Sequence, residues 1–413
     1  MNQMLNDVKR EALARFLRAL EIGGTYIFLV STYVSIAVNS LSMGLMSVTL
    51  LGISITERKW PVRRTPLDYY FAGFLIVQII ATIFSSDPLQ SIILSKRILL
   101  IGLVYFFATI VTTEIRARRL VATLLGTAVI VSVIGVLKLL LGGPGDNTRL
   151  GIFQFYMTTS ELMTIGTLLL FPFAIHPRTP RNVRWLVIAA MLPVLVSLWA
   201  TVTRGAYVAV TAGVLFIAIV RNRRVVIPVI LLVAVIILFA PPYIKGRIES
   251  IVDVNHPENK VRLELWKAGI AIFKDHPVVG VGDIDTGRLI DKYADPSLPR
   301  LWGHLHNTLL QVLVNYGVIG FIVFVAMFVK VARVEWGVFT LVREDWFKGS
   351  FAVGVLAALV AFFVNGLTEW NFGDQEVITL IWTTLGMLIG IGGLTHGSSP
   401  PEPQKTQAAP EPA

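Results

Sequence analysis

Residues 306–331 read HNTLLQVLVNYGVIGFIVFVAMFVKV, and Lys330 is the only Asp, Glu, Lys or Arg among them. A helix needs about 20 predominantly apolar residues to cross a bilayer, so this stretch is long and apolar enough to span one. Similar runs recur along most of the 413 residues. The chain is 54% hydrophobic and 15% charged, with a mean hydropathy of +0.70, a combination that is rare in soluble domains. The sequence therefore predicts an all-α polytopic membrane protein.

The apolar runs predict about twelve transmembrane helices with one large polar loop after the ninth. No small-residue cleavage site follows the first run, so we expect a retained span and not a removed signal peptide. The expected order is a cytoplasmic N-terminus (1–15), helices 1 to 9 (16–240), a periplasmic loop domain (241–305), helices 10 to 12 (306–393) and a disordered cytoplasmic tail (394–413). The predicted spans are 16–37, 38–54, 68–84, 91–111, 120–141, 156–175, 185–200, 205–220, 225–240, 306–331, 350–365 and 377–393.

The basic residues fall on alternate loops, and this distribution sets the predicted orientation. One set of loops carries clusters of Lys and Arg, whereas the alternate short loops hold only Arg149 and Arg204. The positive-inside rule assigns the basic set to the cytoplasm. An even number of spans then leaves both termini in the cytoplasm and the loop 241–305 on the periplasmic side.

Charge and cysteine content exclude several functional classes. A net charge of +10 would suggest nucleic-acid binding in a soluble protein, but here the basic residues lie in short loops between spans. We therefore expect no nucleic-acid partner. The chain has no cysteine, so disulfides, thiolate metal ligation and thiol catalysis are impossible.

The loop 241–305 carries nine Lys or Arg and nine Asp or Glu, which predicts a folded, near-neutral cap. Within it, Pro257–Asp275 has the pattern of an amphipathic helix, and Glu258 places an acid near the positive end of its dipole. His276 and Pro277 end the pattern. We expect this helix to lie along the membrane surface with one apolar stripe, made of Leu263, Trp266, Ile270 and Phe273.

Two arginines on the predicted periplasmic side are candidate anion-binding residues. Arg204 lies between two apolar runs and Arg262 lies on the amphipathic helix. A snorkelling interface arginine and a solvated helix face are the respective structural alternatives. If the two guanidinium groups converge, their fixed charge and forked geometry suit a diphosphate.

His304 and His306 lie where the large loop re-enters the membrane. A histidine that titrates near neutrality is a natural general base, whereas the alternative is a hydrogen-bonded interfacial side chain. Carboxylates on the same side, such as Asp283, Asp285, Glu369 and Asp374, leave a metal site open, but no ligand spacing of the HExxH type supports one. Lys96 and Arg97, near the outer end of the fourth span, either snorkel or line a headgroup cavity.

Three motifs together resemble the O-antigen ligase / O-antigen polymerase superfamily of bacterial inner-membrane glycosyltransferases. The motifs are Thr203-Arg204-Gly205-Ala206, then Arg262-x-x-x-Trp266 leading to Pro277-Val278-Val279-Gly280-Val281-Gly282, and His304-x-His306-Asn307-x-x-Leu310-Gln311 running to Tyr316-Gly317-Val318-Ile319-Gly320. The resemblance covers mainly residues 155–393. The first five spans match only as generic membrane segments.

The resemblance implies transfer of a glycan from undecaprenyl diphosphate at the periplasmic face, with no nucleotide sugar, metal or other cofactor. Arg204 and Arg262 would hold the donor diphosphate, and His306 would be the general base for the acceptor hydroxyl. We predict that His304, Lys96, Arg97, Asn307 and Trp266 bind substrate. In-line attack would invert the anomeric carbon.

The single large loop is most similar to the ligase branch, which joins O-antigen to lipid A–core in lipopolysaccharide. A polymerase of the same superfamily is the alternative, although polymerases often carry two sizeable periplasmic loops and the loop 142–152 is short. A transporter of lipid-linked glycans is an alternative of another class. A transporter would need polar residues along several spans, whereas the charge concentrates on one face.

Overall fold

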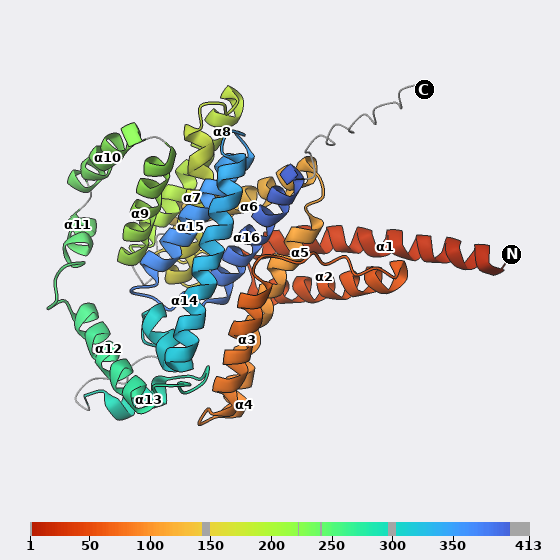
Figure 1. Ribbon diagram of the computed structural model, residues 1–413. Helices are drawn as coiled ribbons and strands as arrows, with labels where there is room; N and C mark the ends of the chain where they lie inside the picture. Colours follow the sequence, from red (N-terminus) through yellow and green to blue (C-terminus); the bar gives the residue numbers. More distant parts are fainter. Residues whose placement is uncertain (1, 143–148, 222, 240–241, 296–302, 397–413) are drawn as a thin grey trace, which may run out of the picture.

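The computed structural model describes residues 2–142, 149–221, 223–239, 242–295 and 303–396, and every regular element in these ranges is helical (Figure 1). Of the predicted tail 394–413, residues 394–396 are helical and residues 397–413 lie outside these ranges. The elements are α1 (Asn2–Ser31), α2 (Ile36–Glu57), α3 (Asp68–Ile83), α4 (Pro88–Ser95), η1 (Lys96–Ile101), α5 (Gly102–Ile110), α6 (Glu114–Gly142), α7 (Tyr156–Ile175), α8 (Arg181–Ala200), α9 (Arg204–Arg221), η2 (Arg223–Val225), α10 (Val226–Leu238), α11 (Pro242–Glu249), α12 (Pro257–Asp275), α13 (Gly287–Tyr293), α14 (Thr308–Val342), α15 (Lys348–Asn365) and α16 (Gln375–His396).

Nine helical stretches in the described residues are long and apolar enough to cross a membrane, fewer than the twelve predicted. α3 is apolar but shorter, with 16 residues. α10 has 13 residues and is roughly 20 Å long, below the thickness of a hydrocarbon core. The first half of α1 carries Lys9, Arg10, Glu11, Arg15 and Arg18, which lowers its hydropathy. The predicted boundary between the first two spans also moves, because Ser35 caps a new helix that begins at Ile36.

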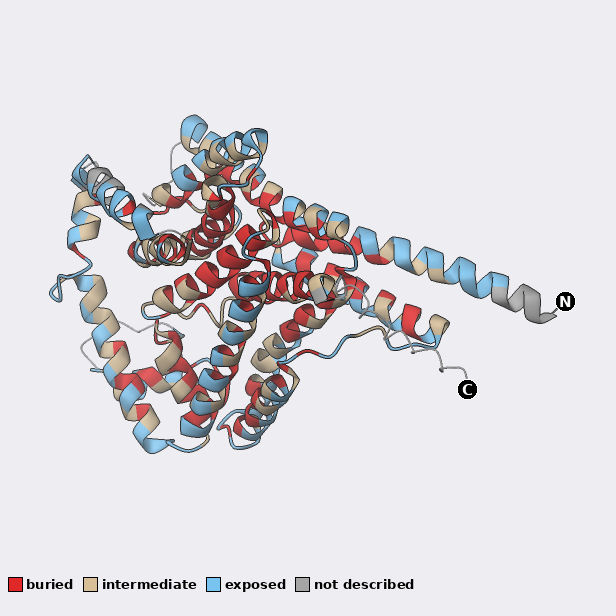
Figure 2. Ribbon diagram, turned by 45° about the horizontal axis from the view of Figure 1, so that its top comes forward, coloured by how far each residue is buried: buried red, intermediate tan, exposed pale blue. Residues whose placement is uncertain are grey.

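α7, α15 and α16 form the centre of the bundle. In an apolar 18-residue stretch of each, 78% of the residues of α7 and α15 and 83% of those of α16 are buried, against 28% in α2 and α8. Figure 2 shows the buried residues concentrated in the middle of the bundle, while the start of α1 projects from it with exposed faces. Aromatic rings fill the core, with Phe328 stacked on both Phe362 and Trp382. The exposed apolar faces of the outer helices are those that lipid would cover.

Contacts between helix ends show that the bundle has two distinct ends. At one end, Arg178 of the α7–α8 loop donates to Glu344 O, and Arg221 of α9 donates to Arg343 O. At the other end, the starts of α9 and α14 lie close to the end of α15: a Cβ added at Gly205 would meet the Asn365 side chain, and Thr308 N donates to Gly366 O. The chain therefore alternates between the ends, as expected for successive spans.

α14 is broken at Gly317, and the break is joined to the large loop. Gly317 has φ of +65°, and a Cβ there would lie 2.2 Å from Val278 O. Val318 N donates to Pro277 O instead of to the helix, while Val314 O accepts from Val281 N. The segment 277–282 thus satisfies backbone groups that the break leaves without helical partners. Within this segment, Gly280 and Gly282 have positive φ.

The large loop has its own small core, which continues into α14. Leu265, Ala268 and Ile272 of α12 pack with residues of the following turns, α13 and Val314. The predicted helix Pro257–Asp275 is confirmed, and it ends at His276 as expected. Of the predicted apolar stripe, Trp266 and Phe273 pack against this core, whereas Leu263 and Ile270 are exposed. The most buried residues of the helix are Leu265, Ala268, Gly269 and Ile272. In Figure 1, α12 and α13 cover the same end of the bundle as α4.

Candidate active site

A cavity of about 900 Å³ lies at the end of the bundle that α12 covers. Its walls come from the segment before α7 and its first turns, the first turns of α12, the loop before α14, and the loop 366–374 between α15 and α16. The lining residues include Arg149, Tyr156, Glu161, Glu258, Arg262, His304, His306, Glu369, Trp370 and Asp374. A cavity with apolar and aromatic walls and a few convergent charges has the general character of a ligand site.

Glu369 links His306 to Arg262 inside this cavity. Its Oε2 lies 2.9 Å from Nδ1 of His306, and its Oε1 accepts from Nη2 of Arg262 at 2.6 Å. The side chains of His306 and Glu369 are buried, and that of Arg262 is 18% exposed. A carboxylate at Nδ1 favours the tautomer that carries its proton there, which makes Nε2 the basic nitrogen.

The loop before α14 holds His306 in a rare backbone conformation. His306 has φ of +45°, a backbone conformation that residues other than glycine seldom adopt. His306 N donates to Nδ1 of His304 at 3.3 Å, and Trp266 Nε1 donates to Leu305 O at 3.1 Å. Asn307 caps α14 through Leu310 N. His306 was predicted to begin the helix, but the helix begins at Thr308, so the imidazole lies on a constrained loop.

Burial is the main cause that lowers the pKa of His304 from 6.5 to about 4, and the neighbouring His306 contributes to the same shift. The two rings are 4.2 Å apart between centroids. His304 is therefore neutral near pH 7 and accepts the backbone hydrogen bond from His306.

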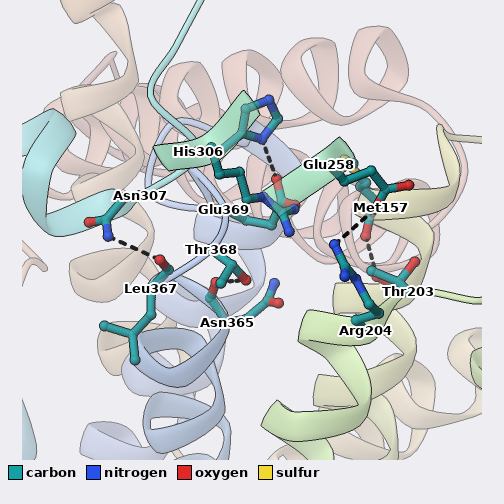
Figure 3. Close-up of polar contacts among 12 residues, drawn as sticks. Met157, Thr203, Arg204, Glu258, His306, Asn307, Asn365, Leu367, Thr368 and Glu369 are labelled. Carbon is teal, nitrogen blue, oxygen red and sulfur yellow. Dashed lines mark hydrogen bonds and ion pairs between the residues drawn. The ribbon is translucent and has the colours of Figure 1, made fainter. Parts of the chain in front are cut away.

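Arg204 begins α9 and points toward the start of α12. Its Nη2 donates to Glu258 Oε2 and Asn259 Oδ1 at 2.9 Å each, and its Nη1 donates to Ser250. Val202, two residues before Arg204, has φ of +52°, an unusual conformation for a β-branched residue. Figure 3 shows Arg204 directed at Glu258, and His306 directed at Glu369.

α12 connects these two groups of charges. Glu258 and Arg262 are four residues apart, so they lie one turn apart on the same face of the helix. Glu258 binds Arg204, and Arg262 binds the Glu369 that contacts His306. The fold thus brings Arg204, Arg262 and His306 to one region, although Arg204 lies behind Glu258 and does not line the cavity.

Residues 189–325 of the chain match the family model described as O-antigen ligase. This match supports the resemblance to the O-antigen ligase superfamily over the matched segment. The matched segment contains Arg204, Arg262, His304 and His306, whereas Glu369 lies after its end. A comparison with curated proteins found no match to the chain.

Two of the residues predicted to bind substrate have structural partners. Asn307 uses its Oδ1 for the α14 cap and its Nδ2 to reach Leu367 O at 3.0 Å. Trp266 supports Leu305 and is not among the residues that line the cavity. Their part in binding stays a prediction.

Lys96 and Arg97 lie in η1, within the stretch 88–110 rather than at its end. Lys96 is exposed and does not line the main cavity. Arg97 forms an ion pair with Asp283 at 3.0 Å and donates to Gly373 O at 2.7 Å. It therefore ties the turn at 283 to the loop 366–374, which carries Glu369.

Sequence reasoning missed the roles of Glu369 and Glu258 as partners of the predicted arginines and histidine. Glu369 was considered only as a metal ligand, and Glu258 only as a helix-terminal acid. The available signal for Glu369 was a carboxylate in a short turn on the same side as Arg204. Within the described ranges, no group of three or more His, Cys, Asp or Glu is placed to hold a metal ion.

Proposed function

We propose that this protein transfers an O-antigen glycan from undecaprenyl diphosphate to lipid A–core at the periplasmic face of the bacterial inner membrane. The observation that carries the proposal is the linkage of His306, Glu369 and Arg262 along one cavity, with Arg204 bound to Glu258, which lies one helical turn from Arg262. A base, a carboxylate that orients it and fixed positive charge are what glycosyl transfer from a diphosphate requires.

In this proposal His306 accepts the proton of the acceptor hydroxyl through Nε2 while the hydroxyl oxygen attacks the anomeric carbon. The bond from that carbon to the diphosphate oxygen breaks, and the lipid diphosphate leaves with the electron pair. Arg204 and Arg262 stabilise the charge that develops on the leaving group. Attack opposite the leaving group inverts the anomeric centre.

Glu369 acts on both His306 and Arg262 in this scheme. It holds the His306 tautomer that leaves Nε2 basic, and it stabilises the imidazolium that forms once the proton is taken. It also keeps Arg262 beside the reaction centre. The basic loops at the opposite end of the bundle support a cytoplasmic location for that end and for both termini.

Reconstitution tests the activity. The purified protein, a lipid-diphosphate-linked glycan and lipid A–core should yield a new glycosidic product, and activity should persist with a chelator. If glycan crosses the bilayer and no bond forms, the transporter alternative replaces the proposal. Activity that is lost with the chelator and restored by one divalent ion would overturn the metal-independent mechanism.

Gene deletion separates the ligase from the polymerase. For a ligase, the cell should lose both long-chain and single-repeat lipopolysaccharide and accumulate the lipid-linked donor. Core that still carries one repeat would identify a polymerase instead.

A further inference from the structure

Three arginines converge on the single carboxylate of Glu258. Arg149, Arg204 and Arg247 reach it at 2.9, 2.9 and 3.0 Å. They come from separate places in the chain: the segment before α7, the start of α9, and α11. All three guanidinium groups are mostly buried, with exposed fractions of 19%, 6% and 18%. The fold therefore concentrates cationic side chains at this point.

The cluster has more positive charge than Glu258 neutralises. Three guanidinium groups against one carboxylate leave two positive charges in excess. Burial alone would raise the pKa of Glu258, but the hydrogen bonds and charges of Arg247 and Arg149 lower it to about 2. Glu258 is thus ionised at neutral pH. Buried charge without a matching counter-ion is costly, so the cluster favours a further anion.

The cluster also has hydrogen-bonding capacity that is not used. Within the described residues, Nε of Arg247 is buried without a hydrogen-bond partner. Arg149 lines the cavity, with its guanidinium 4.7 Å from the centre of the Tyr156 ring. Glu258 lines the cavity as well, and its side chain is 40% exposed. An anion in the cavity would therefore meet Arg149 and Glu258 before the other two arginines.

We infer that Arg149 and Arg247 complete, with Arg204, a diphosphate-binding site, and that Glu258 is the counter-ion which the diphosphate displaces. This inference rests on the proposed function and adds two binding residues and a selectivity element to it. A diphosphate carries roughly one negative charge per phosphate and more acceptor oxygens than a carboxylate, so it suits three forked guanidinium groups better. A monovalent anion offers no such gain over Glu258. Glu258 therefore excludes weak anions from the site.

Direct binding tests the inference without requiring any chemistry. The probe is inorganic diphosphate, titrated into the detergent-purified full chain by calorimetry, with acetate as the monovalent comparison. Glu258→Gln should tighten diphosphate binding about 10-fold and let acetate compete, since it removes the resident carboxylate. Arg149→Gln and Arg247→Gln, with Glu258 intact, should each weaken binding about 10-fold. Glu264→Gln is the matched control on α12, because Glu264 pairs with Lys267 outside the cluster, and its binding should not change.

If a folded Glu258→Gln variant binds diphosphate more weakly, diphosphate does not displace Glu258. Glu258 would then be organising the arginines for binding. Unchanged binding by both arginine variants, or no binding by the native chain, would overturn the site itself. The failure of the proposed function is distinguishable: diphosphate would bind as described while no glycan is transferred. If glycan transfer proceeds and the arginine variants bind normally, only the inference fails.

Discussion

The carboxylate of Glu369 lies 2.9 Å from Nδ1 of His306, although 63 residues separate the two in sequence. The same carboxylate binds Arg262, so one acid holds both the proposed base and one of the proposed anion-binding residues. His306 itself lies in a left-handed backbone conformation that the surrounding hydrogen bonds maintain. Strained conformations of this kind occur often at functional sites, where the geometry must be fixed in advance.

Replacing His306 with alanine should reduce glycan transfer at least about 100-fold, the lower range for loss of a general base. The variant should still fold, because α14 is capped by Asn307 and begins after His306. Product formation by the reconstituted enzyme is the measurement, with expression and melting temperature as folding checks. His276→Ala is the control, since His276 is exposed at the end of α12. Near-normal transfer by His306→Ala would remove the general-base role.

Glu369→Gln should lower kcat about 10- to 100-fold, with a smaller effect on KM for the donor. The amide lacks the charge that stabilises a protonated imidazole and cannot accept equally from both partners, so the His306 tautomer is no longer fixed. The pH–rate profile should shift in the same variant. A purely structural role for Glu369 would lower the melting temperature and leave the profile of the surviving enzyme unchanged.

Arg204→Lys and Arg262→Lys should each remain well below native activity, by about 10-fold or more. Lysine keeps the charge but cannot form the paired contacts of Arg204, which reach Ser250, Glu258 and Asn259 together. Donor binding and kcat should be measured for each variant beside the corresponding alanine variant. Full activity in either lysine variant would show that charge alone is sufficient there.

Stability should fall as the pH drops from about 6.5 toward 4, in part because of His304. The pKa of His304 is lowered from 6.5 to about 4, so in this range the unfolded chain binds a proton that the folded chain does not. The stabilisation is complete above about pH 6.5 and is lost as the pH falls through 4. Melting temperatures of the native chain and His304→Asn, measured from pH 4 to 8, should converge at the acid end. Parallel curves throughout would contradict a contribution of His304 to the pH dependence of stability. His276→Asn is the control and should follow the native curve.

Gly317→Ala should destabilise the protein by at least about 2 kcal/mol, because the residue has positive φ and a Cβ would meet Val278 O at 2.2 Å. Gly337→Ala is the matched control in the same helix, since nothing lies within 4 Å of its Cβ position. Melting temperature and the yield of folded protein from the membrane are the measurements. Equal stability of the two variants would contradict the close packing of segment 277–282 against the break in α14.

The amino-acid sequence by itself determined the helical membrane class and the amphipathic helix Pro257–Asp275, because apolar run length and helical periodicity are local properties. Its short motifs, which are local as well, indicated the resemblance that the family match over residues 189–325 supports. The sequence predicted twelve spans, whereas nine helical stretches in the described residues are long and apolar enough to cross a membrane. The difference lies in helix bounds, such as the 13 residues of α10 and the extension of α1 back through a charged segment, which apolar runs alone do not fix.

Only the tertiary structure decided which charges meet. Glu369 reaches His306 because α15 returns the chain to the end of the bundle where α14 begins, and Glu258 reaches Arg204 because α12 lies across that end. Such pairings depend on how helices distant in the chain pack together, and no local pattern encodes them. The arginines and the histidine were recognisable as residue types, whereas the two carboxylates that organise them became evident only from their positions in space.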